Sequence, residues 1–157
     1  LSALPESARK RFYDMAGFDY DKFAALFDAS SKKNLVIIGT SHGSEESARQ
    51  QRDYVARIVE QYGKGDDIFF KPHPADTSSA GYETEFPGLT LLPGQMPFEI
   101  FVWALIDRVD MIGGYPSTVF LTVPLDKVRF IFAANAESMA RPLNILFRDA
   151  TDVEWMQ

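Results

Sequence analysis

Short apolar runs alternate with amphipathic segments along most of the chain. Each run is bounded by glycine, proline or polar residues, and we predict buried strands at 34–39, 68–71, 89–92, 109–112, 128–132 and 144–147. No two runs are joined by a two-residue hairpin turn. This alternation is typical of βαβ units in a parallel sheet that is covered by helices on both faces.

The segments between the strands carry the three- and four-residue spacing of amphipathic helices. The longest has Tyr54, Val55, Ile58 and Val59 on one face and ends at Gly63. We predict helices at 5–15, from 19 or 20 onward, at 45–62, 97–106 and 116–123, and a terminal helical turn at 152–156. The pattern therefore predicts an α/β fold: a Rossmann-like three-layer αβα domain with a mainly parallel sheet.

Composition limits the class of protein. The chain has 157 residues, of which 46% are hydrophobic, and no repeat or linker divides it, so we predict a single domain over residues 1–157. A net charge of −6 makes a nucleic-acid polymer an unfavourable partner. No apolar run reaches the ~20 residues that span a membrane. The chain has no cysteine, which excludes disulfides and thiol nucleophiles, and its two histidines are too few for a histidine-rich metal site.

Chemically useful side chains follow four of the predicted strands. In open parallel sheets, ligands bind outside the carboxyl ends of the strands, at the point where the strand order reverses. The side chains in question are Thr40, Ser41 and His42 after the first strand, Lys71 and His73 after the second, Glu99 shortly after the third, and Ser117 and Thr118 after the fourth. We therefore expect these groups to meet at one edge of the sheet.

The segment after the fourth strand has the features of a phosphate site. Gly113 and Gly114 permit a tight turn, and Pro116 suits the first position of a helix. Ser117 and Thr118 would then lie in the first helical turn, where hydroxyls, free N–H groups and the helix dipole converge. An ordinary strand-to-helix turn explains the same residues, so this stretch alone does not decide between the two.

The segment Lys71-Pro72-His73-Pro74 is a second candidate. The two prolines fix the backbone on either side of His73, which can donate a hydrogen bond or a proton to a departing phosphate. Lys71 adds a cation nearby. The simpler alternative is a turn histidine that bonds a backbone carbonyl.

Three further residues have a functional and a structural interpretation each. Glu99, in the first turn of a predicted helix, can accept two hydrogen bonds from a ribose diol, or it can simply interact with the helix dipole. Gly39 and Thr40 can bring backbone close to a ligand, or they are an ordinary strand-to-loop connection. His42 is expected to be an exposed loop histidine.

Three motifs together resemble the bacterial sialyltransferases of the Pasteurella and Photobacterium type. The segments are Phe69–Pro74 (FFKPHP), Leu92–Glu99 (LPGQMPFE) and Ile112–Phe120 (IGGYPSTVF). The hallmarks that they resemble are a Lys-x-His-Pro motif, a Phe-Glu pair after a proline turn, and Gly-Gly-x-x-Ser-Ser. Their order and approximate spacing match, so the resemblance covers nearly the whole chain.

The resemblance implies one half of a GT-B glycosyltransferase that is inverting, independent of metal and without a cofactor. Its substrates would be a CMP-activated sugar, most simply CMP-sialic acid, and a glycan acceptor, in the bacterial cytoplasm or peripherally at the inner membrane. By this resemblance His73 assists departure of the CMP phosphate, Ser117 and Thr118 hold that phosphate, Lys71, Pro74 and Glu99 contact the nucleoside, and Gly39 and Thr40 line the pocket.

The chain also departs from the family pattern. Thr118 replaces the second serine and keeps the hydroxyl, and Gly43 stands where well-known members carry a tryptophan over the acceptor. The family's general base is an aspartate in the other half, which would lie before Leu1 together with a partner N-terminal domain. We therefore expect a fragment that binds nucleotide and transfers nothing by itself. A transferase for another CMP-ulosonic acid such as Kdo, and a non-catalytic binding domain, remain open alternatives.

Overall fold

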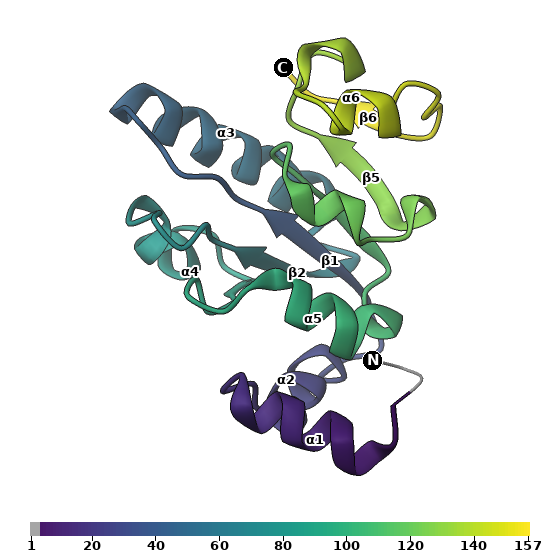
Figure 1. The fold of residues 1–157 in the computed structure, drawn as a ribbon. Coiled ribbons are helices and arrows are strands. Elements are labelled where there is room, and N and C mark those ends of the chain that lie inside the picture. Colours follow the sequence, from purple (N-terminus) through teal and green to yellow (C-terminus); the bar gives the residue numbers. More distant parts are fainter. Residues whose placement is uncertain (1–3) are drawn as a thin grey trace.

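A computed structural model of the chain describes residues 4–157. These residues contain a six-stranded sheet in the order β3-β2-β1-β4-β5-β6, in which every neighbouring pair of strands is parallel. Figure 1 shows β1 and β2 beside each other, with β5 toward the C-terminal end of the chain. The strands are β1 (Lys33–Ile38), β2 (Asp66–Lys71), β3 (Leu89–Leu91), β4 (Met111–Gly114), β5 (Val128–Ile131) and β6 (Glu154–Trp155). The strand order reverses between β1 and β4, which lie side by side. The predicted parallel α/β architecture is confirmed.

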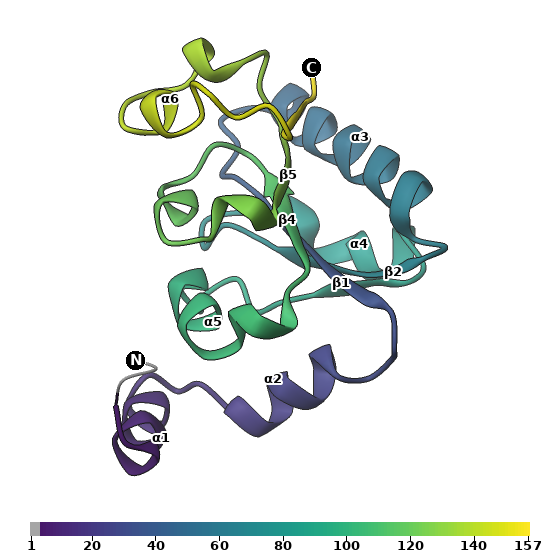
Figure 2. The same cartoon turned by 90° about the vertical axis from the view of Figure 1, so that its right-hand side faces the viewer.

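Helices cover both faces of the sheet. Figure 2 shows α3 on one side of the sheet and α5 on the other. The helices are α1 (Glu6–Met15), α2 (Tyr20–Phe27), α3 (Glu45–Tyr62), α4 (Tyr82–Glu85), α5 (Phe98–Leu105) and α6 (Leu143–Leu146), with 3₁₀ turns η1 (Ser78–Gly81), η2 (Ile106–Arg108), η3 (Thr118–Leu121), η4 (Leu125–Lys127) and η5 (Ala136–Ser138). Over the described residues, no helix is long and apolar enough to cross a lipid bilayer.

The side chains of β1 divide between two cores, one on each face of the sheet. Val36 and Ile38 pack with the residues of α2 and α5, whereas Leu35 and Ile37 pack with the apolar face of α3. All four are almost fully buried. A strand covered on both faces needs an unbroken apolar run rather than an alternating one, and this is why residues 34–39 look as they do in the sequence.

The fourth strand is shifted from its predicted position. The pattern predicts it at 109–112 with the two glycines as a turn, but Gly113 and Gly114 belong to β4 and pair with β1 and β5. A side chain at Gly113 would overlap the Phe130 ring, and one at Gly114 would overlap the backbone of Ile38. The glycines therefore allow close approach between neighbouring strands, and only Gly114, with φ +133°, also has a backbone conformation that favours glycine.

The prediction for the last two elements is wrong. Residues 144–147 are predicted as a strand but belong largely to helix α6, and the predicted terminal helical turn contains strand β6. Leu143 and Phe147 are buried while Ile145 between them is half exposed, as expected for one helical turn. A four-residue apolar run carries too little periodicity to distinguish the two structures. Glu154 and Trp155 are strand because they pair with β5.

Candidate functional site

Three strands end in the same row at one edge of the sheet. Ile38, the last residue of β1, pairs with Lys71 at the end of β2 and with Gly114 at the end of β4. Backbone hydrogen bonds continue past this row, from Gly39 N–H to the Lys71 carbonyl (3.0 Å) and from Tyr115 N–H to the Ile38 carbonyl (2.9 Å). Because neighbouring strands lie about 4.8 Å apart, the loops after β2 and β4 begin roughly 10 Å from each other. The expected meeting of these loops at one edge is confirmed.

His73 lies in a turn directly after β2 and is exposed. The His73 carbonyl accepts from Asp76 N–H (2.9 Å), and the imidazole Nδ1 accepts from Ala75 N–H (3.1 Å). Since Nδ1 accepts, the proton of the neutral ring lies on Nε2, which is left as a donor toward solvent. The alternative of a histidine that donates to a backbone carbonyl does not describe this geometry. Pro74 is exposed beside it.

Lys71 is buried and connects the loops after β2 and β3. It is 4% exposed, and its ammonium donates to the carbonyls of Pro72 (2.7 Å) and Gly94 (2.9 Å). Burial lowers the pKa of Lys71 to about 8, and the Glu99 carboxylate opposes part of that shift. The side chain of Gln95 adds a second connection by donating to the Pro74 carbonyl (3.1 Å).

Glu99 lies in the first turn of α5, close enough to Lys71 to influence its pKa. Pro97 precedes the helix and has no capping side chain, so the carboxylate is the acidic group of that first turn. The side chain is half-buried. This position suits both interpretations of Glu99, as a partner of the helix dipole and as an acceptor for a diol.

The loop after β4 does not open a helix as predicted. Only the one-turn 3₁₀ helix η3 follows, and Ser117 precedes it as the N-cap, with its Oγ accepting from Val119 N–H at 3.3 Å. The β-branched residues Thr118, Val119, Thr122 and Val123 disfavour a longer helix, and Pro124 prevents one from continuing. The expected helix dipole is therefore absent at this position. The hydroxyls remain, with Ser117 half-buried and Thr118 exposed.

The loop after β1 is held by Gln51 of α3. Gly39 is buried, and a Cβ there would lie 2.6 Å from Phe70 Cζ and 3.1 Å from Gln51 Oε1. Thr40 is half-buried, and its N–H donates to Gln51 Oε1 (3.0 Å). Glycine is therefore needed at position 39 because two side chains cross over the backbone there.

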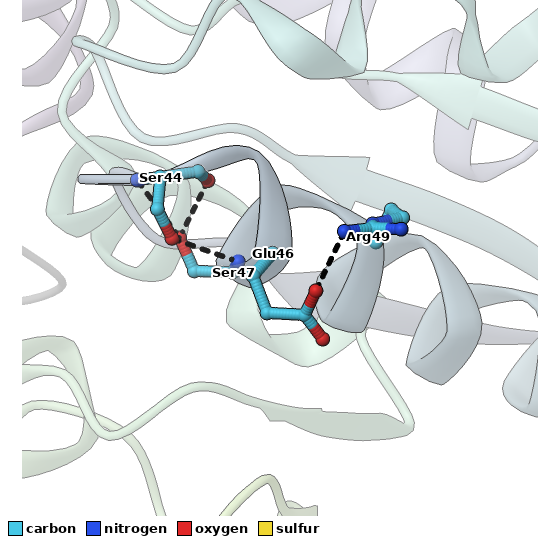
Figure 3. A network of polar contacts seen from close by, with 4 residues as sticks. All are labelled: Ser44, Glu46, Ser47 and Arg49. Carbon is cyan, nitrogen blue, oxygen red and sulfur yellow. Dashed lines mark hydrogen bonds and ion pairs between the residues drawn. The ribbon is translucent and has the colours of Figure 1, made fainter.

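The far end of the same loop closes the N-terminus of α3 (Figure 3). Ser44 Oγ accepts from Ser47 N–H (3.2 Å), and Ser44 N–H donates to Ser47 Oγ (3.3 Å), which makes a reciprocal capping box. Glu46 pairs with Arg49 at 2.7 Å. Caps and acidic side chains occupy this helix end, so it is not an open anion site. His42 is expected to be exposed but is half-buried, with its ring edge-on to Tyr115 at 6.4 Å between centroids.

Two residues at this edge, Gln51 and Asp76, are missed by the sequence analysis. Gln51 is fully buried, and its Nε2 donates to Asp76 Oδ2 (3.3 Å) and Tyr82 OH (3.4 Å). Burial alone would raise the pKa of Asp76, but hydrogen bonds from Ser78, Gln51 and others outweigh it and lower that pKa. The sequence does contain a signal for Gln51. Position 51 falls on the same helical face as Tyr54, Val55 and Ile58, so Gln51 is a polar residue on an apolar stripe.

Two cavities within residues 4–157 are lined by none of the residues predicted for the site. One of about 660 Å³ lies between α1, α2 and α5, lined among others by Arg9, Tyr13, Tyr20 and Trp103. It contains none of the residues predicted for the site. A smaller one of about 240 Å³ touches the edge through Tyr115 and Tyr54. Within residues 4–157, no cluster of three or more His, Asp and Glu side chains is arranged to hold a metal ion.

Known proteins resemble this chain in structure rather than in sequence. No protein-family model matches it, and no curated protein matches it by sequence. Several solved structures do match it. A Photobacterium damselae sialyltransferase, solved as its GT-B domain, matches with a TM-score of 0.77 and 23% identity over 99% of this chain. An α/β-galactoside α-2,3-sialyltransferase from Photobacterium phosphoreum matches with a TM-score of 0.73 and 25% identity over 98%.

The fold is that of the Photobacterium sialyltransferases. A third match, a Photobacterium 2,6-sialyltransferase in a complex with CMP and lactose, has a TM-score of 0.73 and 20% identity. This chain covers 46%, 44% and 36% of those three structures, so it spans less than half of the length of the sialyltransferases that it matches. The expected resemblance is confirmed, and the match to part of a GT-B domain agrees with the predicted fold class.

Proposed function

We propose that this chain is the donor-nucleotide-binding half of an inverting sialyltransferase that uses CMP-sialic acid. The observation that carries the proposal is the row of strand ends, which starts the loops of Thr40, His73 and Ser117 side by side at the point where the strand order reverses. A structure with the same fold was solved with CMP and lactose, which supports CMP as the nucleotide in this proposal. The acceptor glycan and the second half of the enzyme belong to the same proposal.

Each residue has a chemical role in this proposal. The Nε2–H of His73 donates a hydrogen bond to the phosphate oxygen of CMP that leaves the sugar, and this hydrogen bond stabilises the negative charge that develops on that oxygen as the bond to the sugar breaks. The hydroxyls of Ser117 and Thr118 bind the other phosphate oxygens, and the Glu99 carboxylate accepts from the two ribose hydroxyls.

In this proposal the backbone at Gly39, Thr40 and Pro74 lines the nucleoside pocket. Lys71 supports the pocket by joining the loops after β2 and β3 through the carbonyls of Pro72 and Gly94. No metal or cofactor takes part in the proposed reaction. We propose a bacterial cytoplasmic site of action, where activated sugars are consumed.

Calorimetric titration with CMP, UMP and AMP tests the binding step. We expect CMP to bind with a Kd between about 1 µM and 1 mM, because half of a two-domain cleft binds weakly. Replacing both hydroxyls, Ser117→Ala with Thr118→Ala, should weaken CMP binding at least about tenfold. Ser31→Ala, an exposed hydroxyl before β1 at the opposite edge, is the matched control and should change nothing. A folded chain that binds none of the three nucleotides would contradict the proposal and favour a non-catalytic domain.

Turnover tests the role of His73 in a complete transferase that carries this chain. His73→Ala should lower kcat far more than it lowers CMP affinity, since the hydrogen bond from His73 strengthens as charge develops on the departing phosphate. Comparing CMP-sialic acid with CMP-Kdo as donors identifies the sugar. Equal turnover by His73→Ala and the parent enzyme would remove His73 from the chemistry.

A further inference from the structure

Gln51 joins the two loops that carry Thr40 and His73. It projects from α3 and is fully buried, whereas Thr40 is half-buried and His73 is exposed. Its Oε1 accepts from Thr40 N–H (3.0 Å), and its Nε2 donates to Asp76 Oδ2 (3.3 Å). One amide group therefore connects the segment after β1 with the segment after β2.

The connection continues from Asp76 to the imidazole. Asp76 N–H donates to the His73 carbonyl (2.9 Å), which closes the turn 73–76. Within that turn, Ala75 N–H donates to His73 Nδ1 (3.1 Å) and selects the tautomer with its proton on Nε2. Asp76 Oδ1 accepts from Ser78 N–H (2.8 Å), so the carboxylate is held on both sides.

The orientation of the Gln51 amide follows from its partners. A backbone N–H can only donate, so it must face the amide oxygen, and an ionised carboxylate can only accept, so it must face the amide nitrogen. Because the pKa of Asp76 is lowered, its carboxyl group is ionised at neutral pH. Glutamine can therefore accept from Thr40 N–H and donate to the Asp76 carboxylate at the same time.

We infer that Gln51 is a positioning residue, which fixes the tautomer and orientation of His73 and the placement of the Thr40 amide relative to each other. The inference rests on the proposed function for its catalytic meaning, since His73 is the group whose Nε2–H would donate a hydrogen bond to the departing phosphate. Gln51 itself touches no reacting atom. It acts through the turn that holds the imidazole.

The connection has two arms: the hydrogen bond from Thr40 N–H to Gln51 (the Thr40 arm), and the hydrogen bond from Gln51 to Asp76 that leads on to His73 (the His73 arm). Two variants separate them. Gln51→Glu keeps an oxygen for Thr40 N–H but places a carboxylate against Asp76, so only the His73 arm should break. Gln51→Leu removes both arms with a side chain that suits the apolar surroundings of α3. The double variant Gln51→Glu with Asp76→Asn reverses donor and acceptor between the two positions, and the side-chain amide oxygen introduced at position 76 can still accept from Ser78. It should restore the whole connection.

Two measurements on the ligand-free 157-residue chain report the arms independently. The ¹⁵N shifts of the His73 ring in alkaline buffer give the tautomer, and amide hydrogen exchange gives the protection of Thr40. We expect Gln51→Leu to speed exchange at Thr40 about tenfold and to mix the His73 tautomers. Gln51→Glu should mix the tautomers while Thr40 stays protected, and the double variant should recover the parent signals.

Failure of the double variant to recover the parent tautomer, or parent-like signals in Gln51→Leu, would overturn the inference. Asp76→Asn alone keeps the helix face unchanged and should also mix the tautomers, which covers the case that Gln51→Leu does not fold. None of these readouts involves nucleotide. Absence of CMP binding by the parent chain would therefore count against the proposed function and not against the coupling by Gln51.

Discussion

The two sides of the sheet edge are built in different ways. On the side of β2 and β3, the loops are connected by side chains: Gln51 to Asp76, Lys71 to Gly94 and Gln95 to Pro74. On the side of β4, the loop is placed by the strand itself, through Gly113 against Phe130 and Gly114 against the backbone of Ile38. Among the hydrogen bonds of the described residues, the Ser117 hydroxyl takes part only in the one from Val119 N–H, within its own turn. Substitutions on the side of β2 and β3 should therefore affect mainly the loops themselves. Substitutions at the glycines of β4 should affect the packing of the sheet.

Gly114→Ala should have the largest effect. The added Cβ would overlap the Ile38 backbone, which cannot rotate away, and φ +133° is strained for alanine. We expect a loss of about 3 kcal/mol or more in the free energy of unfolding, measured by urea titration. Gly43→Ala is the matched control, because Gly43 is exposed and a Cβ there meets nothing within 4 Å. A mild effect of Gly114→Ala would mean that β1 and β4 lie further apart than described.

Lys71→Met should change how stability depends on pH. The pKa of Lys71 falls from 10.5 to about 8 on folding, so the unfolded chain retains a proton that the folded chain releases between those values. The parent chain should therefore gain stability as pH rises from about 8 toward about 10, and Lys71→Met should lack that gain. Because one pKa unit corresponds to about 1.4 kcal/mol, the difference between the two ends of this pH range should be on the order of 1 to 3 kcal/mol.

The exposed Lys64→Met serves as the control for this pH series. Urea titrations at about pH 7 and about pH 10 on the three proteins make the comparison. Parallel pH dependence in Lys71→Met and the parent would show that Lys71 is not a buried cation.

Ser44→Ala should have a smaller effect, of about 1 kcal/mol, because it removes the cap of α3 at the end of the β1 loop. Glu46→Gln, which breaks the exposed pair with Arg49, should cost at most about 0.5 kcal/mol. Thermal unfolding of the two variants measures both. A larger loss in Glu46→Gln than in Ser44→Ala would contradict this ranking.

Elements with strong periodicity were predictable from the sequence, and short ones were not. Helix α3 has eighteen residues with a buried face on which Gln51 precedes the apolar Tyr54, Val55 and Ile58, and it lies where the pattern predicts it. Residues 144–147 and 154–155 were assigned wrongly because a run of two to four residues takes its structure from its neighbours. The shift of β4 has the same origin, since only Phe130 and Ile38 reveal why its two glycines are in a strand.

The candidate site was predictable in place but not in detail. Polar residues after parallel strands must gather at one edge, so the neighbourhood of Thr40, His73 and Ser117 followed from strand assignment alone. The connection through Gln51 did not, because it joins positions 40, 51 and 76, and a sequence does not specify which side chains meet across such separations. The length of the helix after β4 was overestimated because proline and hydroxyl residues also suit a single 3₁₀ turn.

Mapping CMP onto this chain by amide chemical shifts tests the account most directly. CMP should move the signals of residues 39–40, 73–76 and 117–119, in the three loops that begin in one row of the sheet. Shifts confined to Arg9, Tyr20 and Trp103, in the 660 Å³ cavity between α1, α2 and α5, would contradict it.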